Sequence, residues 1–394
     1  MCQPILEQEA AHMSLSSFKI AHKLITGAAA IEQLAAELTR LDVDNPLIVT
    51  DAALVRSGTV DLALQHLGGR DYEIFDRVMP DPEIAIVEDC MQAYRDGGHD
   101  GLIGLGGGSA IDIAKCVGVY AGYHGELQDM FGVDQVPRKG PPMIAIPTTA
   151  GTGSEVTNVA ILSDKAAQLK KGIVSDYLLP DVALVSPQMT LTCPPGVTAA
   201  SGVDALAHAV ESYLSLNASP ITDALAIGAI RLISRALPKA FANPAHLQAR
   251  EDMATASLMA GMAFGNAGVG AVHALAYPLG GRFHVSHGVA NAMLLPYVMQ
   301  WNKMACVERM RDIAEAMGIK TDHLSDLEAA NEAVEAMAAL CSAVEIPKGL
   351  SGLGVTEGVI PSMAVEAAGI ERLMRNNPRK LSVADIEKIY RAAY

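Results

Sequence analysis

The 394-residue sequence has few charged residues and few aromatic residues, and basic residues are outnumbered. Charged residues make up 19% of the chain and aromatic residues 4%, whereas half of it is hydrophobic. Because so apolar a chain can offset the entropy lost on ordering, we exclude intrinsic disorder. Against 44 Asp and Glu residues stand 29 Lys and Arg residues, so the formal net charge is −15. No cluster of Lys and Arg residues in the sequence offsets this negative charge, and we therefore expect no nucleic-acid partner.

Paired cysteines, a signal peptide and long apolar runs are also missing. The six cysteines are scattered and form no CxxC pair, which in a chain of this length predicts reduced thiols instead of disulfides or a zinc ribbon. The N-terminal segment has no basic region followed by an apolar core. No apolar run reaches the roughly 18 residues that a membrane span needs. We therefore expect a cytoplasmic protein with no membrane partner.

Up to about residue 195, short apolar runs alternate with amphipathic stretches. Short apolar strands separated by helices are typical of a parallel α/β sheet that is buried on both faces. The predicted strands cover 47–50, 72–75, 101–105, 143–147 and 182–185, and the predicted helices between them cover 83–95 and 109–120.

Beyond the breaker Pro194-Pro195-Gly196, strand signals nearly vanish and Ala-, Leu- and Met-rich stretches follow with helical periodicity. The sequence thus predicts two domains, an α/β domain over residues 1–195 and an all-helical domain over residues 196–394. The predicted helices of the second domain cover 199–216, 222–241, 247–264, 291–307, 327–343 and 384–393.

A glycine-rich turn joins one of the predicted strands to a helix, in the sequence GLIGLGGGSAIDIAK (101–115). Glycines let backbone N–H groups approach a phosphate, and the helix dipole adds partial positive charge there. Ser109 and Asp112 have the spacing of a capping box, which predicts that the helix begins at Ser109. The strict GxGxxG pattern is not kept, so a pyrophosphate cradle and a tight turn without a ligand are both open.

Two further segments follow predicted strands of the same domain. Asp51 comes directly after the first strand and is either an acceptor for an adenosine ribose or the N-cap of the next helix. The segment PTTAGTGSEVT (147–157) is rich in hydroxyl groups and glycine. It either wraps a polar ligand at the carboxyl edge of the sheet or hydrogen-bonds its own backbone.

The helical domain carries a set of candidate metal ligands. Asp204 and His208 are four residues apart, which on a helix places them on one face. His273, His284 and His287 follow in a stretch of small apolar residues, where a buried ionisable group needs a partner. Imidazole with carboxylate suits Fe²⁺ or Zn²⁺. Each histidine taken singly is more often an ordinary residue, and spacing does not separate His284 from His287.

Together these segments resemble the iron-containing (group III) alcohol dehydrogenase family, and the resemblance spans nearly the whole chain. It implies the dehydroquinate synthase-like fold, with NAD(P) and a divalent metal, Fe²⁺ or Zn²⁺, meeting in a cleft between the two domains. The motifs that carry it, in chain order, are LIVTD, Pro80-Asp81-Pro82, GGGSAIDIAK, PTTAGTGSEVT, LLPDVALVSP, GVDALAHAVE, HALAYPLGGRFHVSHGVANAMLLP and NPRKLSVADIEKIYRAAY.

Position by position, the resemblance implies roles for individual residues. Asp204, His208, His273 and His287 match the metal ligands, so that His284 is not one. Gly106, Gly107, Gly108 and Ser109 match the pyrophosphate loop, and Asp51 matches an acidic residue that favours NAD over NADP. Thr148, Thr149, Thr152 and Lys170 match positions around the nicotinamide and its ribose, and Phe264 matches a wall of the substrate pocket.

The sequence departs from the family pattern at Tyr277. Many members have a histidine at this position, four residues after the third metal ligand, and that histidine is implicated in proton relay. A phenol, with a usual pKa of about 10, is a poorer base at neutral pH than an imidazole. Tyr277 nevertheless stays a candidate catalytic residue, beside His273 and Phe264. Three routes for the proton are open: through Tyr277 itself, the cofactor ribose, or a metal-bound water.

The function implied is a metal-dependent, NAD-linked alcohol dehydrogenase or aldehyde reductase acting on a small substrate, in a homodimer or larger homo-oligomer. The acidic total weakly favours neutral substrates, although local charge in the pocket could overrule it. Three alternatives are open. One is a hydroxyacid–oxoacid transhydrogenase or other related reductase, one is a dehydroquinate synthase-like lyase, and the third is a nucleotide-binding protein with an inactive site. The lyase is disfavoured because no Lys/Arg cluster surrounds the histidines.

Overall fold

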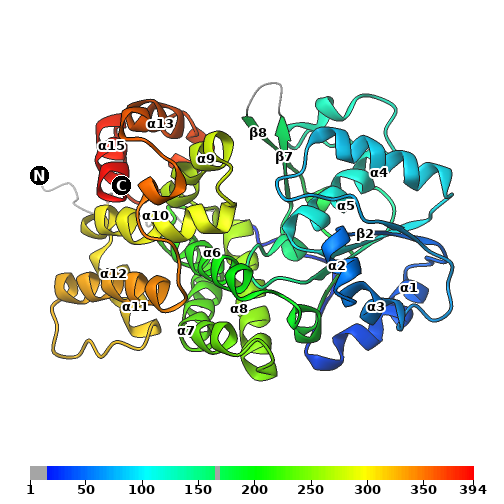
Figure 1. Cartoon of the computed structure of the whole chain (residues 1–394), viewed down its shortest axis with the longest axis horizontal. Coiled ribbons are helices and arrows are strands. Elements are labelled where there is room, and N and C mark those ends of the chain that lie inside the picture. Colours follow the sequence, from blue (N-terminus) through cyan, green and yellow to red (C-terminus); the bar gives the residue numbers. More distant parts are fainter. Residues whose placement is uncertain (1–15, 165–168) are drawn as a thin grey trace, which may run out of the picture.

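The computed structural model describes residues 16–164 and 169–394. An α/β half and a helical half lie side by side (Figure 1). The first 15 residues, which carry most of the segment for which no signal peptide is expected, lie outside the described residues.

A six-stranded sheet forms the framework of the α/β half. Its strands run in the order β1-β9-β6-β4-β2-β3, and every neighbouring pair is parallel. The predicted parallel sheet is therefore confirmed, and only β1 was not foreseen. The strands are β1 (Leu24–Thr26), β2 (Pro46–Val49), β3 (Glu73–Phe75), β4 (Gly101–Gly106), β6 (Met143–Pro147) and β9 (Val182–Val185).

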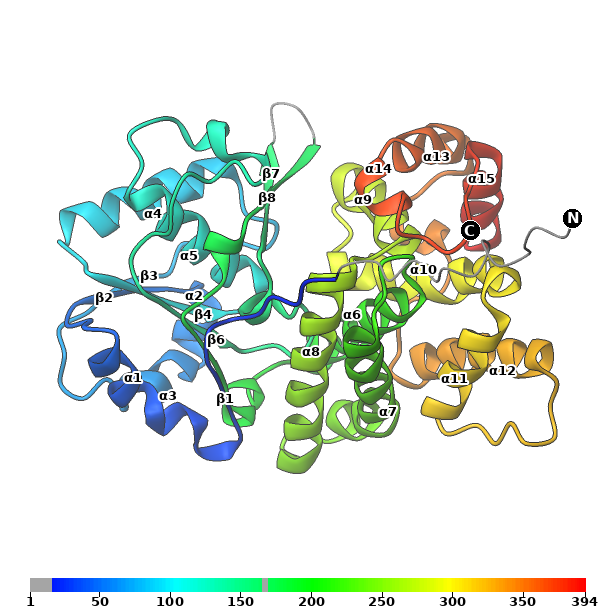
Figure 2. The ribbon, with the colours of Figure 1, turned by 180° about the vertical axis from the view of Figure 1, so that it is seen from behind.

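Helices cover both faces of this sheet. Because successive strand residues point to opposite faces, Leu47 and Val49 of β2 pack into one apolar core while Ile48 between them packs into another. The first core lies under α4 and α5 and the second under α1 and α3, on the two sides of the sheet in Figure 2. The helices are α1 (Leu34–Arg40), α2 (Ala52–Arg56), α3 (Thr59–Leu64), α4 (Ile84–Asp96) and α5 (Gly108–Ala121).

A second, three-stranded sheet was not predicted. It consists of β5 (Gly132–Val133), β7 (Val159–Asp164) and β8 (Leu169–Val174), and β7 runs antiparallel to β8. The pair Lys170-Lys171 hides the strand pattern of β8, because only one face of the sheet is apolar. On that face Leu162 and Ile173 pack into the core shared with α4 and α5.

The second half is helical, as predicted, and its helices share one large apolar core. Many of the core residues are alanines, which allow helix axes to approach closely. The helices are α6 (Pro195–Leu214), α7 (Pro220–Ala242), α8 (Leu247–Ala267), α9 (Ala271–Phe283), α10 (His287–Asn302), α11 (Val307–Ala316), α12 (Asp326–Ala343), α13 (Ile360–Ala368), α14 (Glu371–Met374) and α15 (Val383–Ala392).

One helix prediction in this half is wrong, and helices α9, α11, α13 and α14 were not predicted. The single helix predicted over 291–307 is wrong, since α10 begins at His287, ends at Asn302, and is followed by a 3₁₀ turn over Lys303–Ala305 before α11. Helix α9 was missed because it contains Pro278 and two glycines, which are local helix-breaking signals. Tertiary packing overrides these signals, since most of the helix is buried in the core.

The last strand of the main sheet ends at Val185 and α6 begins at Pro195. We keep a domain boundary near residue 195 as a proposal that agrees with this change of structure.

Among the described residues, no single helix is both long and apolar enough to cross a membrane. Only α8 and α9 taken together meet the length and hydropathy required, and they are bent by 101° relative to each other.

Candidate metal and cofactor site

Four candidate metal ligands converge in the helical half. Asp204 and His208 lie one turn apart on α6, His273 lies in the first turn of α9, and His287 is the first residue of α10. One donor atom from each of the four lies within 4.8 Å of the others. Donors around a tetrahedral zinc-like cation lie about 3.3–3.6 Å apart, so the four side chains would close in slightly around a bound cation.

Hydrogen bonds fix the ring orientation of two of these histidines. Nδ1 of His208 donates to the carbonyl oxygen of Gly151 over 3.1 Å, and Nδ1 of His273 donates to Glu211 over 2.6 Å. Nε2 of His273 is buried without a hydrogen-bond partner and lies 3.9 Å from Oδ1 of Asp204. A buried polar atom without a partner needs an explanation, and a cation between these donors supplies one.

The electrostatics of the cluster fit a divalent cation. Burial lowers the pKa of both His208 and His287 to about 4, so both imidazoles are neutral at pH 7 and keep a lone pair. Burial by itself raises the pKa of Asp204, but the surrounding histidines and an amide hydrogen bond hold it below its usual range. The set therefore combines one carboxylate with imidazoles, which is the donor chemistry of Fe²⁺ and Zn²⁺ sites.

Two residues of this cluster were missed by the sequence analysis. Asn291 has its amide nitrogen 2.7 Å from Oδ1 of Asp204 and 3.0 Å from Nε2 of His287. Glu211 accepts the hydrogen bond of His273. The only local signal was spacing, since Asn291 lies four residues after His287 and Glu211 three residues after His208 on the same helix.

Aromatic side chains line one side of the cluster. The ring of Phe264, on α8, stacks on the imidazole of His208 with centroids 4.2 Å apart and planes 16° apart. Tyr277 lies one turn after His273 on α9, and its ring centroid is 6.4 Å from that of His287. Its hydroxyl accepts a hydrogen bond from Nη2 of Arg372, an exposed residue of α14. His284 ends α9 in a left-handed conformation and is exposed, outside the cluster.

The candidate cofactor residues follow the carboxyl ends of three neighbouring strands, where parallel sheets bind ligands. Asp51 follows β2, the glycine turn follows β4, and the threonine-rich loop follows β6. A Cβ atom added to Gly108 would lie 2.9 Å from the side chain of Thr152, so the turn and the loop touch and only glycine fits between them. Gly107 lies near Thr149, and the backbone N–H of Thr148 donates to Gly106.

Local hydrogen bonding bears on two of the helix starts expected from the sequence. Asp51 is the N-cap of α2, because its Oδ1 accepts from the backbone N–H groups of Ala53 and Leu54. The capping box at Ser109 is wrong, since α5 begins at Gly108 with Gly107 as its N-cap and no side-chain cap. The carboxylate of Asp112 instead accepts from the backbone N–H of Ile161 in β7.

A cavity of about 450 Å³ lies between the two halves and joins the two sets of residues. Of the candidate cofactor residues, Asp51, Gly106, Gly107, Thr148 and Thr149 lie outside its lining. Lys170, which is ion-paired with Asp81, reaches it from β8. The candidates that line it are Gly108, Ser109, Thr152 and Lys170 from the α/β half and Asp204, His208, Phe264, His273, Tyr277 and His287 from the helical half.

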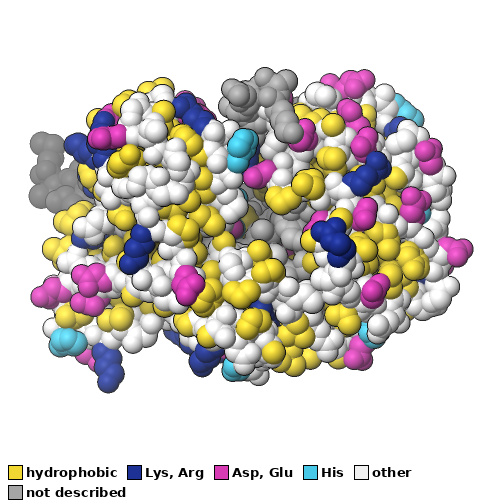
Figure 3. Space-filling view, viewed as in Figure 1, with side chains coloured by type: hydrophobic (Ala, Val, Ile, Leu, Met, Phe, Trp, Pro, Cys, Tyr) yellow, Lys and Arg dark blue, Asp and Glu magenta, His cyan; other side chains and the backbone are white. Residues whose placement is uncertain are grey.

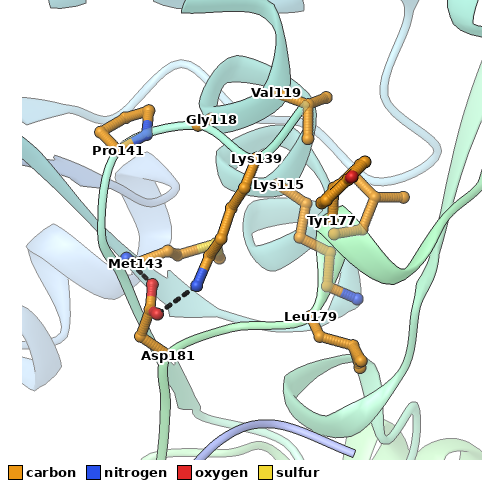
Figure 4. A pocket seen from close by; sticks show the side chains of 11 residues that line it. Lys115, Gly118, Val119, Lys139, Pro141, Met143, Tyr177, Leu179 and Asp181 are labelled. Carbon is orange, nitrogen blue, oxygen red and sulfur yellow. Dashed lines mark hydrogen bonds and ion pairs between the residues drawn. The ribbon is translucent and has the colours of Figure 1, made fainter. Parts of the chain in front are cut away.

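A second crevice, within the α/β half, is far smaller. It has a volume of about 10 Å³, roughly that of one water molecule. Lys139 and Asp181 form an ion pair on its wall (Figure 4). Over the face of the molecule in Figure 3, acidic and basic side chains are interspersed without a continuous basic tract. We therefore take the interdomain cavity as the functional site.

Comparison with known proteins agrees with this arrangement. Residues 21–187 match the family model described as iron-containing alcohol dehydrogenase, and residues 198–394 match that of the Fe-containing alcohol dehydrogenase family, C-terminal. The chain is 47% identical to long-chain-alcohol dehydrogenase 1 of Geobacillus thermodenitrificans, covering 93% of this chain and 94% of the relative. It is 37% identical to the NAD-dependent methanol dehydrogenase of Bacillus methanolicus, covering 96% and 100%.

A solved structure of 1,3-propanediol oxidoreductase superposes with a TM-score of 0.94 at 41% identity, covering 96% of this chain and all of that one. Fold and sequence together define an oxidoreductase with one α/β and one helical half. The chain belongs to the iron-containing alcohol dehydrogenase family.

Proposed function

We propose that this chain interconverts a small alcohol and its aldehyde with NAD(H) and a bound Fe²⁺ ion. The observation that carries the proposal is the shared cavity, in which the candidate ligands Asp204, His208, His273 and His287 face the glycine turn of the α/β half. Relatives named for methanol and for long-chain alcohols support an alcohol as substrate and leave its chain length open.

The four ligand candidates would hold the cation. When bound, a divalent cation supplies Lewis-acid chemistry toward an alcohol or carbonyl oxygen. Iron is our proposal because the family is iron-containing. Nδ1 of both His208 and His273 donates a hydrogen bond, which leaves Nε2 of each ring as the atom that would bind the cation.

The α/β half would hold the cofactor. The turn Gly106-Gly107-Gly108 with Ser109 offers backbone N–H groups at the start of α5 for the pyrophosphate. We propose that Thr148, Thr149, Thr152 and Lys170 contact the nicotinamide and its ribose. Asp51 would favour NAD over NADP, because its carboxylate repels a 2′-phosphate and Oδ2 is not used in the cap of α2.

Residues of the helical half would orient the substrate. Phe264 covers one side of His208 and gives the substrate an apolar wall next to the cation ligands. Tyr277 is the candidate for holding or passing a proton, since its hydroxyl is hydrogen-bonded to Arg372 and the residue lines the same cavity. Hydride transfer needs the reacting carbon and the nicotinamide within roughly 3–3.5 Å, which the two walls of the cavity would enforce.

The test is a substrate panel assayed with the full chain loaded with Fe²⁺ under anaerobic conditions. Primary alcohols of increasing length, diols and hydroxyacids are offered with NAD⁺, and the corresponding aldehydes with NADH, and NADH absorbance is followed. We expect turnover that disappears on chelation. An inactive loaded protein across the panel would refute the proposal. Product formation without free NAD would instead indicate transhydrogenation.

We further propose that the protein works in the cytoplasm as a homodimer or a larger homo-oligomer, as the family resemblance suggests. Light scattering coupled to size-exclusion chromatography measures the mass directly. A mass of one 41.3 kDa chain at micromolar concentration would contradict the oligomer.

A further inference from the structure

Glu211 makes two short hydrogen bonds with the start of α9. It lies on α6, and its side chain is only 2% exposed. Oε1 accepts from the backbone N–H of Val272 over 2.6 Å, and Oε2 accepts from Nδ1 of His273, also over 2.6 Å. One carboxylate thus holds both the backbone and the imidazole of the same helical turn.

The N-terminus of α9 depends on side chains, because the first N–H groups of a helix have no partner within it. Oδ1 of Asn377 accepts from Ala271 over 3.3 Å, and Glu211 accepts from Val272. A Cβ atom added to Gly270 would lie 3.0 Å from Oδ1 of Asn377 and 3.2 Å from Oε1 of Glu211, so the two caps close tightly over the chain. The helix dipole places partial positive charge at this end of α9, next to the Glu211 carboxylate.

The second bond has a consequence for the imidazole. Because an ionised carboxylate only accepts hydrogen bonds, Nδ1 of His273 must carry the ring hydrogen. Nε2 then keeps its lone pair, and this is the buried atom that has no partner and faces Asp204 across 3.9 Å. His208 instead donates its comparable bond to a neutral carbonyl oxygen, that of Gly151.

We propose that Glu211 is a positioning residue that fixes the orientation and tautomer of His273, so that Nε2 is presented to the divalent cation. The inference rests on the proposed metal site and adds a residue that is not itself a ligand. A carboxylate behind a ligand histidine also raises the basicity of the imidazole, and loss of such a partner typically costs 10–100-fold in metal affinity.

The decisive variant is Glu211→Gln, which keeps the size of the side chain. The amide oxygen still accepts from Val272, whereas the amide nitrogen can only donate toward His273. Nδ1 then becomes an acceptor, and the ring hydrogen moves to Nε2, where it faces the cation. We expect a 10–100-fold rise in the dissociation constant for Fe²⁺, measured anaerobically on apo-protein by competition with a chromophoric chelator, and a partial recovery in Glu211→Asp.

Asn377→Ala provides the matched control, because it removes a cap from the same helix end without touching His273. It should lower the unfolding temperature and leave Fe²⁺ affinity closer to that of the wild type than Glu211→Gln does. Equal loss of affinity in the two variants would show that Glu211 only caps the helix, and unchanged affinity in Glu211→Gln would overturn the proposal. If Asn377→Ala does not fold, the comparison of Gln with Asp at position 211 still decides. A wild-type chain that binds no Fe²⁺ would refute the metal site itself.

Discussion

The hydroxyl of Tyr277 and the guanidinium of Arg372 are hydrogen-bonded, with 3.4 Å between the oxygen and Nη2. Both residues line the interdomain cavity, although they come from α9 and from α14, near the end of the chain. The phenol of Tyr277 therefore takes the position where the family pattern has a histidine, and its oxygen contacts the positively charged guanidinium of Arg372. An arginine cannot accept a proton, so the pair has only the phenol oxygen as an acceptor.

Tyr277→His should raise activity near neutral pH if proton transfer limits the rate. At a pH of about 6.5, half of the imidazole groups with the usual pKa are in the basic form, whereas a phenol is almost fully protonated. We expect kcat at pH 7 to increase by roughly 10-fold or more, within the range of general-base effects. The pH–rate profile is the measurement, and Tyr277→Phe separates the hydroxyl from the ring. A profile unchanged in both variants would place proton transfer elsewhere.

Asp51 combines a structural and a proposed recognition role, and the two can be separated by choosing the substituent. Asp51→Ser keeps an N-cap for α2 but removes the negative charge. The ratio of kcat/KM for NADPH to that for NADH should rise by about tenfold or more, equivalent to about 1.4 kcal/mol. Asp71→Ser, at an exposed aspartate, is the charge-matched control and should leave the ratio unchanged. The same ratio in both variants would reduce Asp51 to a helix cap.

The layered fold was predictable because its signals are local. The short apolar strand around Ile48 is buried on both faces, and the run from Pro195 onward has helical periodicity. The hydrogen bond between Asp112 and Ile161 was not predictable, since it joins residues 49 apart and diverts the carboxylate from the helix cap that spacing suggested. A local sequence pattern cannot show that a side chain has a hydrogen-bond partner in a distant segment of the chain.

The candidate metal cluster shows the same limit. Asp204 and His208 are neighbours on one helix face, so their pairing followed from spacing alone. His284 and His287 were not separable in this way, because one ends α9 and the other begins α10. The backbone between them, which is left-handed at His284, decides which of the two faces inward. Glu211 was missed because its partner His273 lies 62 residues away.

His273→Ala should lose bound iron and turnover while NADH binding is kept, because the proposed cofactor residues belong to the other half of the molecule. Elemental analysis and NADH fluorescence titration measure the two properties separately. The matched control is His284→Asn, since His284 is exposed and Asn tolerates its left-handed conformation. Iron content equal to that of the wild type in His273→Ala would contradict the ligand assignment.

Glu155 is a buried carboxyl group that makes stability depend on pH. It lies in the 3₁₀ turn Ser154–Val156 and is 2% exposed. Burial raises the pKa of Glu155 from 4.5 to about 7, even though the ammonium of Lys115 nearby opposes the rise. Lys115 does not donate to this carboxyl group but to the carbonyl oxygens of Thr157 and Val159.

The folded chain therefore holds a proton at Glu155 that the unfolded chain releases first. Between pH 4.5 and pH 7 the free energy of unfolding should fall as pH rises, by up to about 3 kcal/mol from this group at about 1.4 kcal/mol per pH unit. Glu155→Gln removes the ionisable group, so it should be more stable than the wild type at pH 8 and lose that advantage at pH 4.5. Urea unfolding of the apo-proteins at both pH values is the measurement. Glu335→Gln, at an exposed position of α12, should show no such difference. A Glu155→Gln variant whose stability differs from the wild type by the same amount at both pH values would mean that folding does not raise the pKa of Glu155.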